Sequence, residues 1–350
     1  MSGSTVLYMV IPCYNEQEIF TYSKNHLKQK LTQLMRQGKI SQRSKICFVN
    51  DGSTDKTWEL IQEACAEDTI FSGICLSHNE GHQNAVLAGL MTVLPYADVA
   101  ISMDADLQDD IEAVDQMLDR YDEGYNIVYG VRSSRKKDSI FKRMTAEGYY
   151  KFLEWMGVHI IYNHSDFRLM DKKALNAMSE FKEVNLFLRG IVPLIGLKNC
   201  SVYYARKERV AGESKYPLRK MLAFAWQGIT SFSMEPIKWI TNLGLVMTGG
   251  SFLIFLYSLY RYIEGATIVG WTSLMLSVWF IGGALLFSLG IIGEYIGKTY
   301  MEVKHRPRFI ISAFIDENKC RRGVKWPCRI LHTSNQLRIG SWKKIFGFIY

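Results

Sequence analysis

Two long stretches of this 350-residue chain lack charged side chains entirely. No Asp, Glu, Lys or Arg occurs in residues 239–260 or in residues 266–293. Each stretch holds the ~20 apolar residues that an α-helix needs to cross the hydrocarbon of a bilayer. The mean hydropathy of -0.03 averages these stretches with a far more polar remainder. We therefore expect a membrane-bound protein and not a plain cytosolic enzyme.

Several common motifs are also missing. The first strand-to-helix turn has no GxGxxG pattern, which counts against a nicotinamide-dependent enzyme, and the absence of GxxxxGK[ST] excludes a P-loop kinase. None of the seven cysteines is part of a CxxC pair, so a structural zinc site is not expected. The N-terminus lacks a basic region followed by a long apolar one, so we predict no cleavable signal peptide.

Acidic residues are absent from the C-terminal end. Residues 318–350 carry eight Lys and Arg, and the 34 basic residues that precede them balance the 34 acidic residues of the chain. The net charge of +8 is therefore local, and a nucleic-acid partner is not expected. A basic end after a membrane span favours contact with anionic lipid headgroups, and a solvated disordered tail is an equally good alternative.

The first 130 residues alternate short apolar runs with helical patterns. Helices are expected from Ser53 or Thr54 to Cys65 and over residues 84–94. Strands are expected at residues 6–11, 46–49, 73–76, 99–103 and 127–131. This alternation predicts an α/β fold with a Rossmann-like, mostly parallel sheet and helices on both faces. Ligands of such sheets bind outside the carboxyl ends of the strands, where polar clusters of this sequence fall.

Asp104 and Asp106 follow the fourth apolar run at positions i and i+2. They are expected at the end of the strand, where this spacing makes both carboxylates leave on the same side. Carboxylates this close repel unless a cation lies between them, and oxygen ligands suit Mg²⁺ or Mn²⁺ that also bridges substrate phosphates. Gln108 could add a carbonyl oxygen. A DxD pattern by itself is weak evidence, because it is common in acidic loops, but its place at a strand end favours the metal site.

Asp51 opens a second polar cluster, DGSTD at residues 51–55, where a strand ends and a helix begins. A helix N-terminus favours anions, and Asp51 could accept hydrogen bonds from a ribose or a base edge. On local grounds alone, a turn followed by a helix cap explains the cluster better.

Basic amphipathic segments with Trp occur at residues 140–158 and 215–238, and the second directly precedes an uncharged stretch. They are typical of a membrane surface, and a helix packed on its own domain is the alternative. Basic residues follow the second uncharged stretch and are nearly absent between the two: Lys298, Lys304, Arg306 and Arg308, against Arg261. The positive-inside bias predicts two transmembrane helices with both termini in the cytoplasm.

Seven motifs together resemble one enzyme family: VIPCYNE (10–16), VNDGSTD (49–55), MDADLQD (103–109), GVR (130–132), DFRLMD (166–171), FLRG (187–190) and RVAGESKY (209–216). With GEYIG (293–297) after two spans, the chain resembles GT-A-type family 2 glycosyltransferases, and within them polyprenyl-phosphate glycosyltransferases close to bactoprenol glucosyltransferases. Dolichyl-phosphate mannose synthase is a more distant relative. The resemblance covers roughly residues 5–312, and the tail after Phe314 does not fit it.

The resemblance implies roles for matching positions. The nucleoside of the donor would be held by Pro12, Tyr14, Glu16 and Asp51. The metal and the diphosphate would be held by Asp104, Asp106 and Gln108. Arg132 would face the phosphates. Asp166 would lie near the sugar or the acceptor, and a structural cap or a partner of Arg168 is the alternative. The lipid phosphate would be bound by Arg206, Arg209 and Lys215, for which solvated surface charge is the alternative.

The expected function is an inverting transfer of a sugar, glucose by resemblance, from a UDP-sugar to undecaprenyl phosphate. Another hexose, an N-acetylhexosamine, or a sensor or scaffold without turnover is the alternative. We expect a cytoplasmic catalytic domain (1–214), an interfacial helix (215–238), two spans with a short external loop (239–297) and a cytoplasmic basic tail (298–350) in a bacterial inner membrane. Glycines in the spans permit helix contacts within one chain or in a homo-oligomer.

Overall fold

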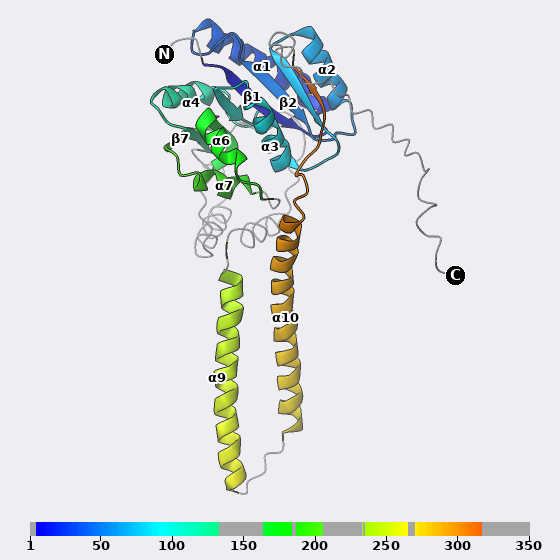
Figure 1. Cartoon of the computed structure of the whole chain (residues 1–350), viewed down its shortest axis with the longest axis vertical. Coiled ribbons are helices and arrows are strands. Elements are labelled where there is room, and N and C mark those ends of the chain that lie inside the picture. Colours follow the sequence, from blue (N-terminus) through cyan, green and yellow to red (C-terminus); the bar gives the residue numbers. More distant parts are fainter. Residues whose placement is uncertain are drawn as a thin grey trace, which may run out of the picture.

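An α/β domain and two long helices that extend from one side of it make up the computed structural model (Figure 1). The structure describes residues 5–132, 164–183, 187–205, 233, 235–264 and 270–316. The expected amphipathic segments at 140–158 and 215–238 lie outside the described residues, apart from the last residues of the second one.

One eight-stranded sheet forms the centre of the domain, in the order β7-β5-β6-β4-β1-β2-β3-β8. The strands are β1 (Leu7–Cys13), β2 (Lys45–Asn50), β3 (Phe71–Leu76), β4 (Val99–Ser102), β5 (Ile127–Arg132), β6 (His164–Asp171), β7 (Asn199–Tyr204) and β8 (Ile311–Ile315). Parallel pairing joins β4, β1, β2 and β3, and also β5 and β7. Strand β6 runs antiparallel between β4 and β5, and β8 runs antiparallel to β3. The expected α/β fold with a mostly parallel sheet is therefore confirmed.

Helices cover both faces of the sheet. They are α1 (Gln17–Arg36), α2 (Thr57–Glu67), α3 (His82–Val93), α4 (Ala113–Asp122), α6 (Lys172–Ser179) and α7 (Leu188–Leu194). Alternate residues of the fully buried strand β1 point to opposite faces. Met9 belongs to the core cluster that includes residues of α1, α2 and α4, and Val10 belongs to the cluster that includes residues of α3, α6 and α7. Burial on both faces explains why β1 and β2 are continuous apolar runs.

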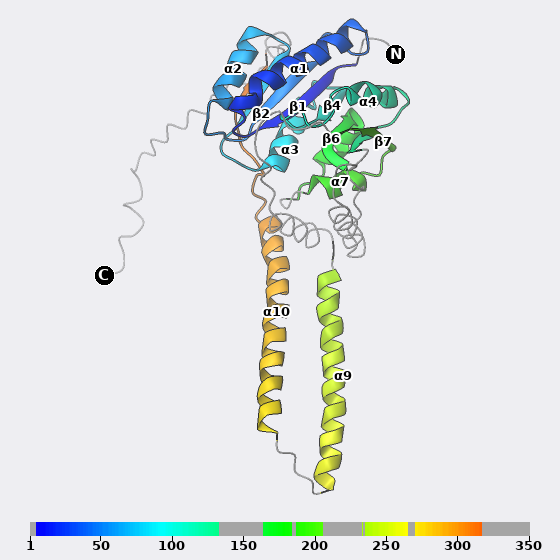
Figure 2. The same cartoon turned by 180° about the vertical axis from the view of Figure 1, so that it is seen from behind.

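Two long helices, α9 (Glu235–Ile263) and α10 (Trp271–Val303), leave the same side of the domain, as both views show (Figures 1 and 2). Among the described residues, one segment, Phe280–Val303, is long and apolar enough to cross a membrane, and 6% of it is buried. The structure thus supports one of the two expected spans, and the span in α9 stays a prediction.

The chain returns to the domain after α10. Strand β8 adds to the edge of the sheet beside β3, with Ile315 opposite Gly73. Asp316, at its end, forms an ion pair of 2.5 Å with Lys45, and both side chains are buried. The sequence predicted a tail from residue 298 onward, whereas the structure places residues 311–316 in the same domain as β1. A short strand whose partner lies more than 200 positions away leaves no local signal.

Candidate active site

The carboxyl ends of β1, β2 and β4 meet at one edge of the sheet. Strand β1 lies between β2 and β4, so the connections that follow β1 and β4 lead to opposite sides. Such a switch in strand order opens a crevice at the strand ends in α/β sheets. The polar clusters of the sequence follow these three strands, so the sheet brings them together.

The loops after β1 and β2 are joined by hydrogen bonds. The backbone N–H of Asn15 donates to Oγ of Ser53 at 3.0 Å, and its side-chain Oδ1 accepts from the N–H of Thr54 at 2.9 Å. The N–H of Glu16 donates to the hydroxyl of Thr57 at 3.0 Å. The cluster at 51–55 therefore fixes the neighbouring loop, and helix α2 begins only at Thr57 and not at Ser53 or Thr54.

Asp51 ties this pair of loops to the start of α3. Its side chain is buried, and its two carboxylate oxygens accept from the N–H groups of Glu80 at 2.8 Å and Gly81 at 3.0 Å. Burial raises the pKa of Asp51, and these two hydrogen bonds oppose that shift. Gly52 beside it has φ +62°, and a Cβ there would lie 2.4 Å from the carbonyl carbon of His78. Only glycine fits at position 52 without moving the loop at residues 78–81.

The four residues implied in nucleoside binding lie at these strand ends. Pro12 is buried within β1, and Tyr14 follows the strand with 47% of its surface exposed. Glu16 precedes α1 and is half-buried. Asp51 lies at the same loops, but both of its carboxylate oxygens accept hydrogen bonds from the backbone of residues 80–81. Tyr14 is thus the member of the set that presents the most surface to a ligand.

Asp104 and Asp106 lie in a turn and not on a strand. Strand β4 ends at Ser102, and Leu107 has a positive φ of 48°. The sequence argument that placed both carboxylates on one side of a strand is therefore wrong in its geometry. The two carboxylates still influence each other, since the charge of Asp106 contributes to raising the pKa of Asp104. Gln108 is buried, and its backbone N–H donates to Oδ1 of Asp106 at 3.2 Å.

The carboxylate of Asp104 fits a divalent cation. Its Oδ1 is buried and has no hydrogen-bond partner among the described residues. Burial, and then repulsion from Asp109, Asp166 and Asp106, raises the pKa of Asp104 to about 6. The charge of His82 opposes this shift but does not cancel it, and a divalent cation would neutralise the remaining negative charge. Within the described residues, no group of three or more His, Cys, Asp or Glu side chains could hold a metal ion.

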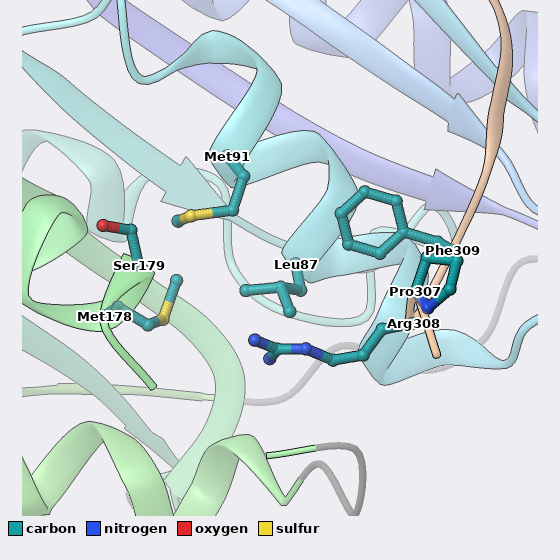
Figure 3. Close-up of a pocket in the computed structure, with 7 residues that line it drawn as sticks. All are labelled: Leu87, Met91, Met178, Ser179, Pro307, Arg308 and Phe309. Atoms are coloured by element: carbon teal, nitrogen blue, oxygen red, sulfur yellow. The ribbon is translucent and has the colours of Figure 1, made fainter. Parts of the chain in front are cut away.

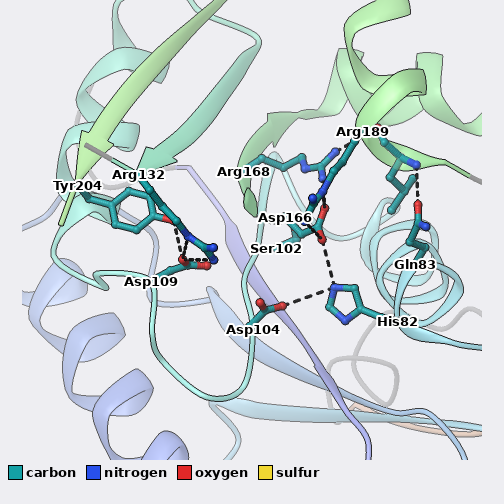
Figure 4. Close-up of polar contacts among 11 residues, drawn as sticks. His82, Gln83, Ser102, Asp104, Asp109, Arg132, Asp166, Arg168, Arg189 and Tyr204 are labelled. Atoms are coloured by element: carbon teal, nitrogen blue, oxygen red, sulfur yellow. Dashed lines mark hydrogen bonds and ion pairs between the residues drawn. The ribbon is translucent and has the colours of Figure 1, made fainter. Parts of the chain in front are cut away.

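A charged cluster lies beside the Asp104 turn (Figure 4). Its centre is Asp166 on β6, whose Oδ1 accepts from Nη2 of Arg168 at 2.5 Å. Arg189, on α7, approaches the same carboxylate with Nη2 3.2 Å from Oδ2 and Nε 3.4 Å from Oδ1. Burial alone would raise the pKa of Asp166, but Arg189, His82 and Arg168 hold it well below its usual range. Asp166 is therefore an anion and not a proton donor.

His82 bridges the two carboxylates. Its Nε2 lies 3.5 Å from Oδ1 of Asp104 and 3.5 Å from Oδ2 of Asp166, as Figure 4 shows. Burial disfavours the charged imidazole, but the hydrogen bond to Asp166 and the charge of Asp104 outweigh it and raise the pKa of His82. The first residue of α3 thus connects the candidate metal ligand with the charged cluster.

Arg132, at the end of β5, contacts Asp109 and lies at the other side of the Asp104 turn (Figure 4). Its Nη2 lies 3.1 Å from Oδ1 of Asp109, which also accepts from the hydroxyl of Tyr204 at 2.5 Å. Asp109 is 2% exposed, so β5 and β7 anchor the turn that carries Asp106. A contact of Arg132 with phosphates stays a prediction.

The remaining site residues divide into those outside the described part and those that sequence reasoning missed. Arg206, Arg209 and Lys215 lie outside the described residues. His82, Asp109, Arg189 and Tyr204 received no role from the sequence. Asp109 and Arg189 stand in the motifs MDADLQD and FLRG, which were the available signal.

A separate cavity of about 270 Å³ lies between α3, α6 and the segment that follows α10 (Figure 3). Leu87, Met91, Met178 and Phe309 line it together with Arg308, whose Nη2 donates to the carbonyl of Phe181 at 2.5 Å. None of its lining residues belongs to the polar site described above, so the candidate active site is the polar crevice and not this cavity.

Comparisons with known proteins identify the family. Residues 8–179 match the family described as glycosyl transferase family 2. A Bacillus subtilis protein described as the uncharacterized glycosyltransferase YkoT is 48% identical over 307 residues, which cover 88% of this chain and 91% of the relative. The bactoprenol glucosyl transferase of Shigella phage SfV is 35% identical over 309 residues, which cover 87% of this chain and 97% of the relative.

Among solved structures, glucosyl-3-phosphoglycerate synthase from Mycobacterium tuberculosis aligns with a TM-score of 0.41 and 14% identity, over 65% of this chain and 78% of that chain. The two sequence alignments extend across both the sheet domain and the long helices. Together with the family match, they show that this chain belongs to glycosyltransferase family 2.

Proposed function

We propose that this glycosyltransferase moves a sugar from a UDP-sugar to undecaprenyl phosphate with inversion at the anomeric carbon. A phosphate oxygen of the acceptor attacks C1 of the sugar while the bond between C1 and the UDP oxygen breaks. The products are UDP and a sugar linked to the lipid through one phosphate. The similarity to a bactoprenol glucosyl transferase supports the lipid acceptor and favours glucose as the sugar.

The order of the sites along the sheet carries this proposal. The loops that are joined by hydrogen bonds follow β1 and β2, and the turn with Asp104 and Asp106 follows β4. Asp166 lies on β6, the next strand in the sheet. A nucleoside, a diphosphate and a reacting sugar follow one another in the same order in a UDP-sugar. We assign the nucleoside to the loops of Tyr14, Glu16 and Asp51, with Pro12 beneath them.

Asp104, Asp106 and Gln108 would hold Mg²⁺ or Mn²⁺. The ion would neutralise the charge that develops on the UDP leaving group. Asp104 contributes a carboxylate oxygen without a hydrogen-bond partner among the described residues, and Asp109 and Arg132 hold the turn in place. The ionised Asp166 and the cations around it line the next part of the crevice, where we place the sugar and the acceptor.

The acceptor needs no strong general base. The second pKa of a phosphate monoester is near ~6, so much of the acceptor is already a dianion at neutral pH. The protein must instead hold this anion beside the diphosphate, and arginine does so best because its planar fork matches phosphate oxygens. By resemblance, Arg206, Arg209 and Lys215 are candidates for this role.

The reaction would take place at the cytoplasmic face of a bacterial inner membrane. Helix α10 contains the segment long and apolar enough to span, and basic residues follow it: Lys304, Arg306 and Arg308. These residues favour the cytoplasmic side, where the α/β domain would also lie.

Two experiments test the function. Purified protein with Mg²⁺ or Mn²⁺ should transfer label from a UDP-sugar to undecaprenyl phosphate, and EDTA should abolish transfer. Asp104→Asn should lower turnover by at least ~10²-fold, the scale of losing a main electrostatic stabiliser. Asp122→Asn, an exposed acid on α4, is the matched control and should keep full activity.

A panel of labelled donors then identifies the sugar. UDP-glucose should be the best substrate, and a higher rate with another UDP-hexose or with an N-acetylhexosamine donor would change the assignment. Binding of UDP-sugar without product from any donor would indicate a sensor or a scaffold.

A further inference from the structure

Arg189 reaches the candidate active site from α7, whose start is held from two sides. The N–H of Leu188 donates to Oε1 of Gln83 at 2.8 Å, and its carbonyl accepts from Nη1 of Arg168 at 3.3 Å. Gln83 follows His82 at the beginning of α3. The position of Arg189 is thus fixed by residues on α3 and β6, next to the crevice that the Asp104 turn borders.

The two arginines around Asp166 have different environments. Arg168 is 1% exposed and lies 2.5 Å from Oδ1 of Asp166, so it depends on this carboxylate as its counterion. Arg189 is 32% exposed, and its contacts with the same carboxylate are longer, at 3.2 and 3.4 Å. Arg189 is therefore the more loosely held and the more accessible of the two arginines.

The position of Arg189 favours the acceptor over the donor. Along the sheet, the candidate nucleoside loops follow β1 and β2, the metal turn follows β4, and Asp166 lies on β6. Arg189 approaches Asp166 from α7, so it lies beyond the metal turn as seen from the nucleoside loops. Both views place α7 on the side of the domain from which α9 and α10 extend (Figures 1 and 2). A phosphate attached to a membrane lipid must enter from that side.

We propose that Arg189 binds the phosphate of the acceptor lipid, exchanging part of its contact with Asp166 for two phosphate oxygens. This inference rests on the proposed function. A dianionic phosphate offers Arg189 more charge than a carboxylate that is already shared with Arg168. Asp166, still paired with Arg168, then keeps the guanidinium oriented toward the attacking oxygen.

The test compares Arg189→Gln and Arg189→Lys with the wild type in transfer from a UDP-sugar to undecaprenyl phosphate. Arg189→Gln should raise KM for the acceptor by at least about tenfold, the scale of losing a hydrogen bond to a charged group. Arg189→Lys keeps the positive charge but loses the planar guanidinium that can donate two parallel hydrogen bonds. Its KM for the acceptor should therefore lie between those of the wild type and Arg189→Gln.

The Kd of UDP in the presence of Mn²⁺ should stay within about twofold of the wild type, the spread expected for a site the substitution does not touch. Arg120→Gln, an exposed arginine paired with Glu123 on α4, is the control and should change none of these values.

A second acceptor separates the phosphate from the lipid chain. With a short-chain prenyl phosphate, Arg189→Gln should lower kcat/KM by the same factor as with undecaprenyl phosphate, because both carry the same phosphate. An unchanged acceptor KM would overturn the inference and leave Arg189 as a partner of Asp166 alone. A weaker Kd for UDP with an unchanged acceptor KM would assign Arg189 to the donor diphosphate. Absence of transfer by the wild type would instead refute the proposed function, so the two failures are distinguishable.

Discussion

Lys45 and Asp316, which lie 271 positions apart in the chain, form a buried ion pair of 2.5 Å. Lys45 begins β2 in the middle of the sheet, and Asp316 follows the edge strand β8. The hydroxyl of Tyr8 donates to the other carboxylate oxygen of Asp316 at 3.3 Å. The pair thus joins the segment that returns from α10 to the strands that carry the active-site loops.

Removal of Asp316 should destabilise the domain. Asp316→Ala leaves the ammonium of Lys45 buried without its partner, which costs about 3–5 kcal/mol in comparable pairs. Amide hydrogen exchange of β8 and β3, together with urea unfolding, measures the loss. The double variant Lys45→Met/Asp316→Leu replaces the pair with apolar groups and should recover most of the stability. Equal stability of Asp316→Ala and the wild type would contradict this view of β8.

Gly52→Ala should weaken nucleotide binding. The added Cβ would lie 2.4 Å from the backbone of His78 and would displace the loop that holds Glu80 and Gly81 against Asp51. Gly38 also has a positive φ, but a Cβ added there would meet no atom within 4 Å, so Gly38→Ala isolates the cost of the backbone conformation, about 1–2 kcal/mol. Isothermal titration with UDP and Mn²⁺ should show weaker binding for Gly52→Ala only. Equal loss in both variants would mean that backbone strain, and not the clash, is responsible.

Metal binding should depend on pH through Asp104. Burial and the neighbouring carboxylates raise the pKa of Asp104 to about 6, and a protonated carboxyl is a poor ligand. The Kd of Mn²⁺ should therefore be constant above this pH and rise about tenfold per pH unit below it, as one proton competes with the ion. Electron paramagnetic resonance of free Mn²⁺ measures this curve.

A substitution of His82 checks the assignment of that curve. The charge of His82 lowers the pKa of Asp104. His82→Gln should therefore raise that pKa and move the pH below which the Kd of Mn²⁺ begins to rise to a higher value. A Kd that does not change between pH 7 and 5 would show that Asp104 does not titrate there or does not bind the metal.

Membrane topology is a prediction from the sequence. Thr267 lies between α9 and α10 in the chain, in the expected external loop, and Ser2 lies near the N-terminus. In a variant without native cysteines, Thr267→Cys should react with an impermeant thiol reagent on intact spheroplasts, and Ser2→Cys only after lysis. Labelling of Ser2→Cys from outside would reverse the orientation and remove the argument for a cytoplasmic donor.

Local patterns predicted the parallel part of the sheet well. The apolar run at 46–49 is observed as Lys45–Asn50, because a strand buried on both faces is a continuous apolar run bounded by polar residues. Strand β6 was not predicted, because the buried pair of Asp166 and Arg168 lies within it and breaks the apolar pattern.

The candidate site also has a part that local patterns predicted and a part that they did not. Asp104 and Asp106 are two positions apart, so the sequence alone suggests a shared ligand, although it does not show that they lie in a turn. The Asp166 cluster combines residues from α3, β6 and α7, and only the folded chain brings His82 and Arg189 to the same carboxylate. Sequence patterns contain the residues of such a cluster but not their contacts.

The most direct test of the account is the structure of the product. The protein in lipid nanodiscs, with Mn²⁺, UDP-α-glucose labelled with ¹³C at C1 and undecaprenyl phosphate, should release UDP and form one lipid-linked product. Inverting transfer predicts that NMR of this product shows a β-anomeric carbon coupled to a single phosphorus. An α-linked product would contradict direct attack by the acceptor phosphate. Release of free glucose without any lipid-linked sugar would contradict the central claim that a polyprenyl phosphate is the acceptor.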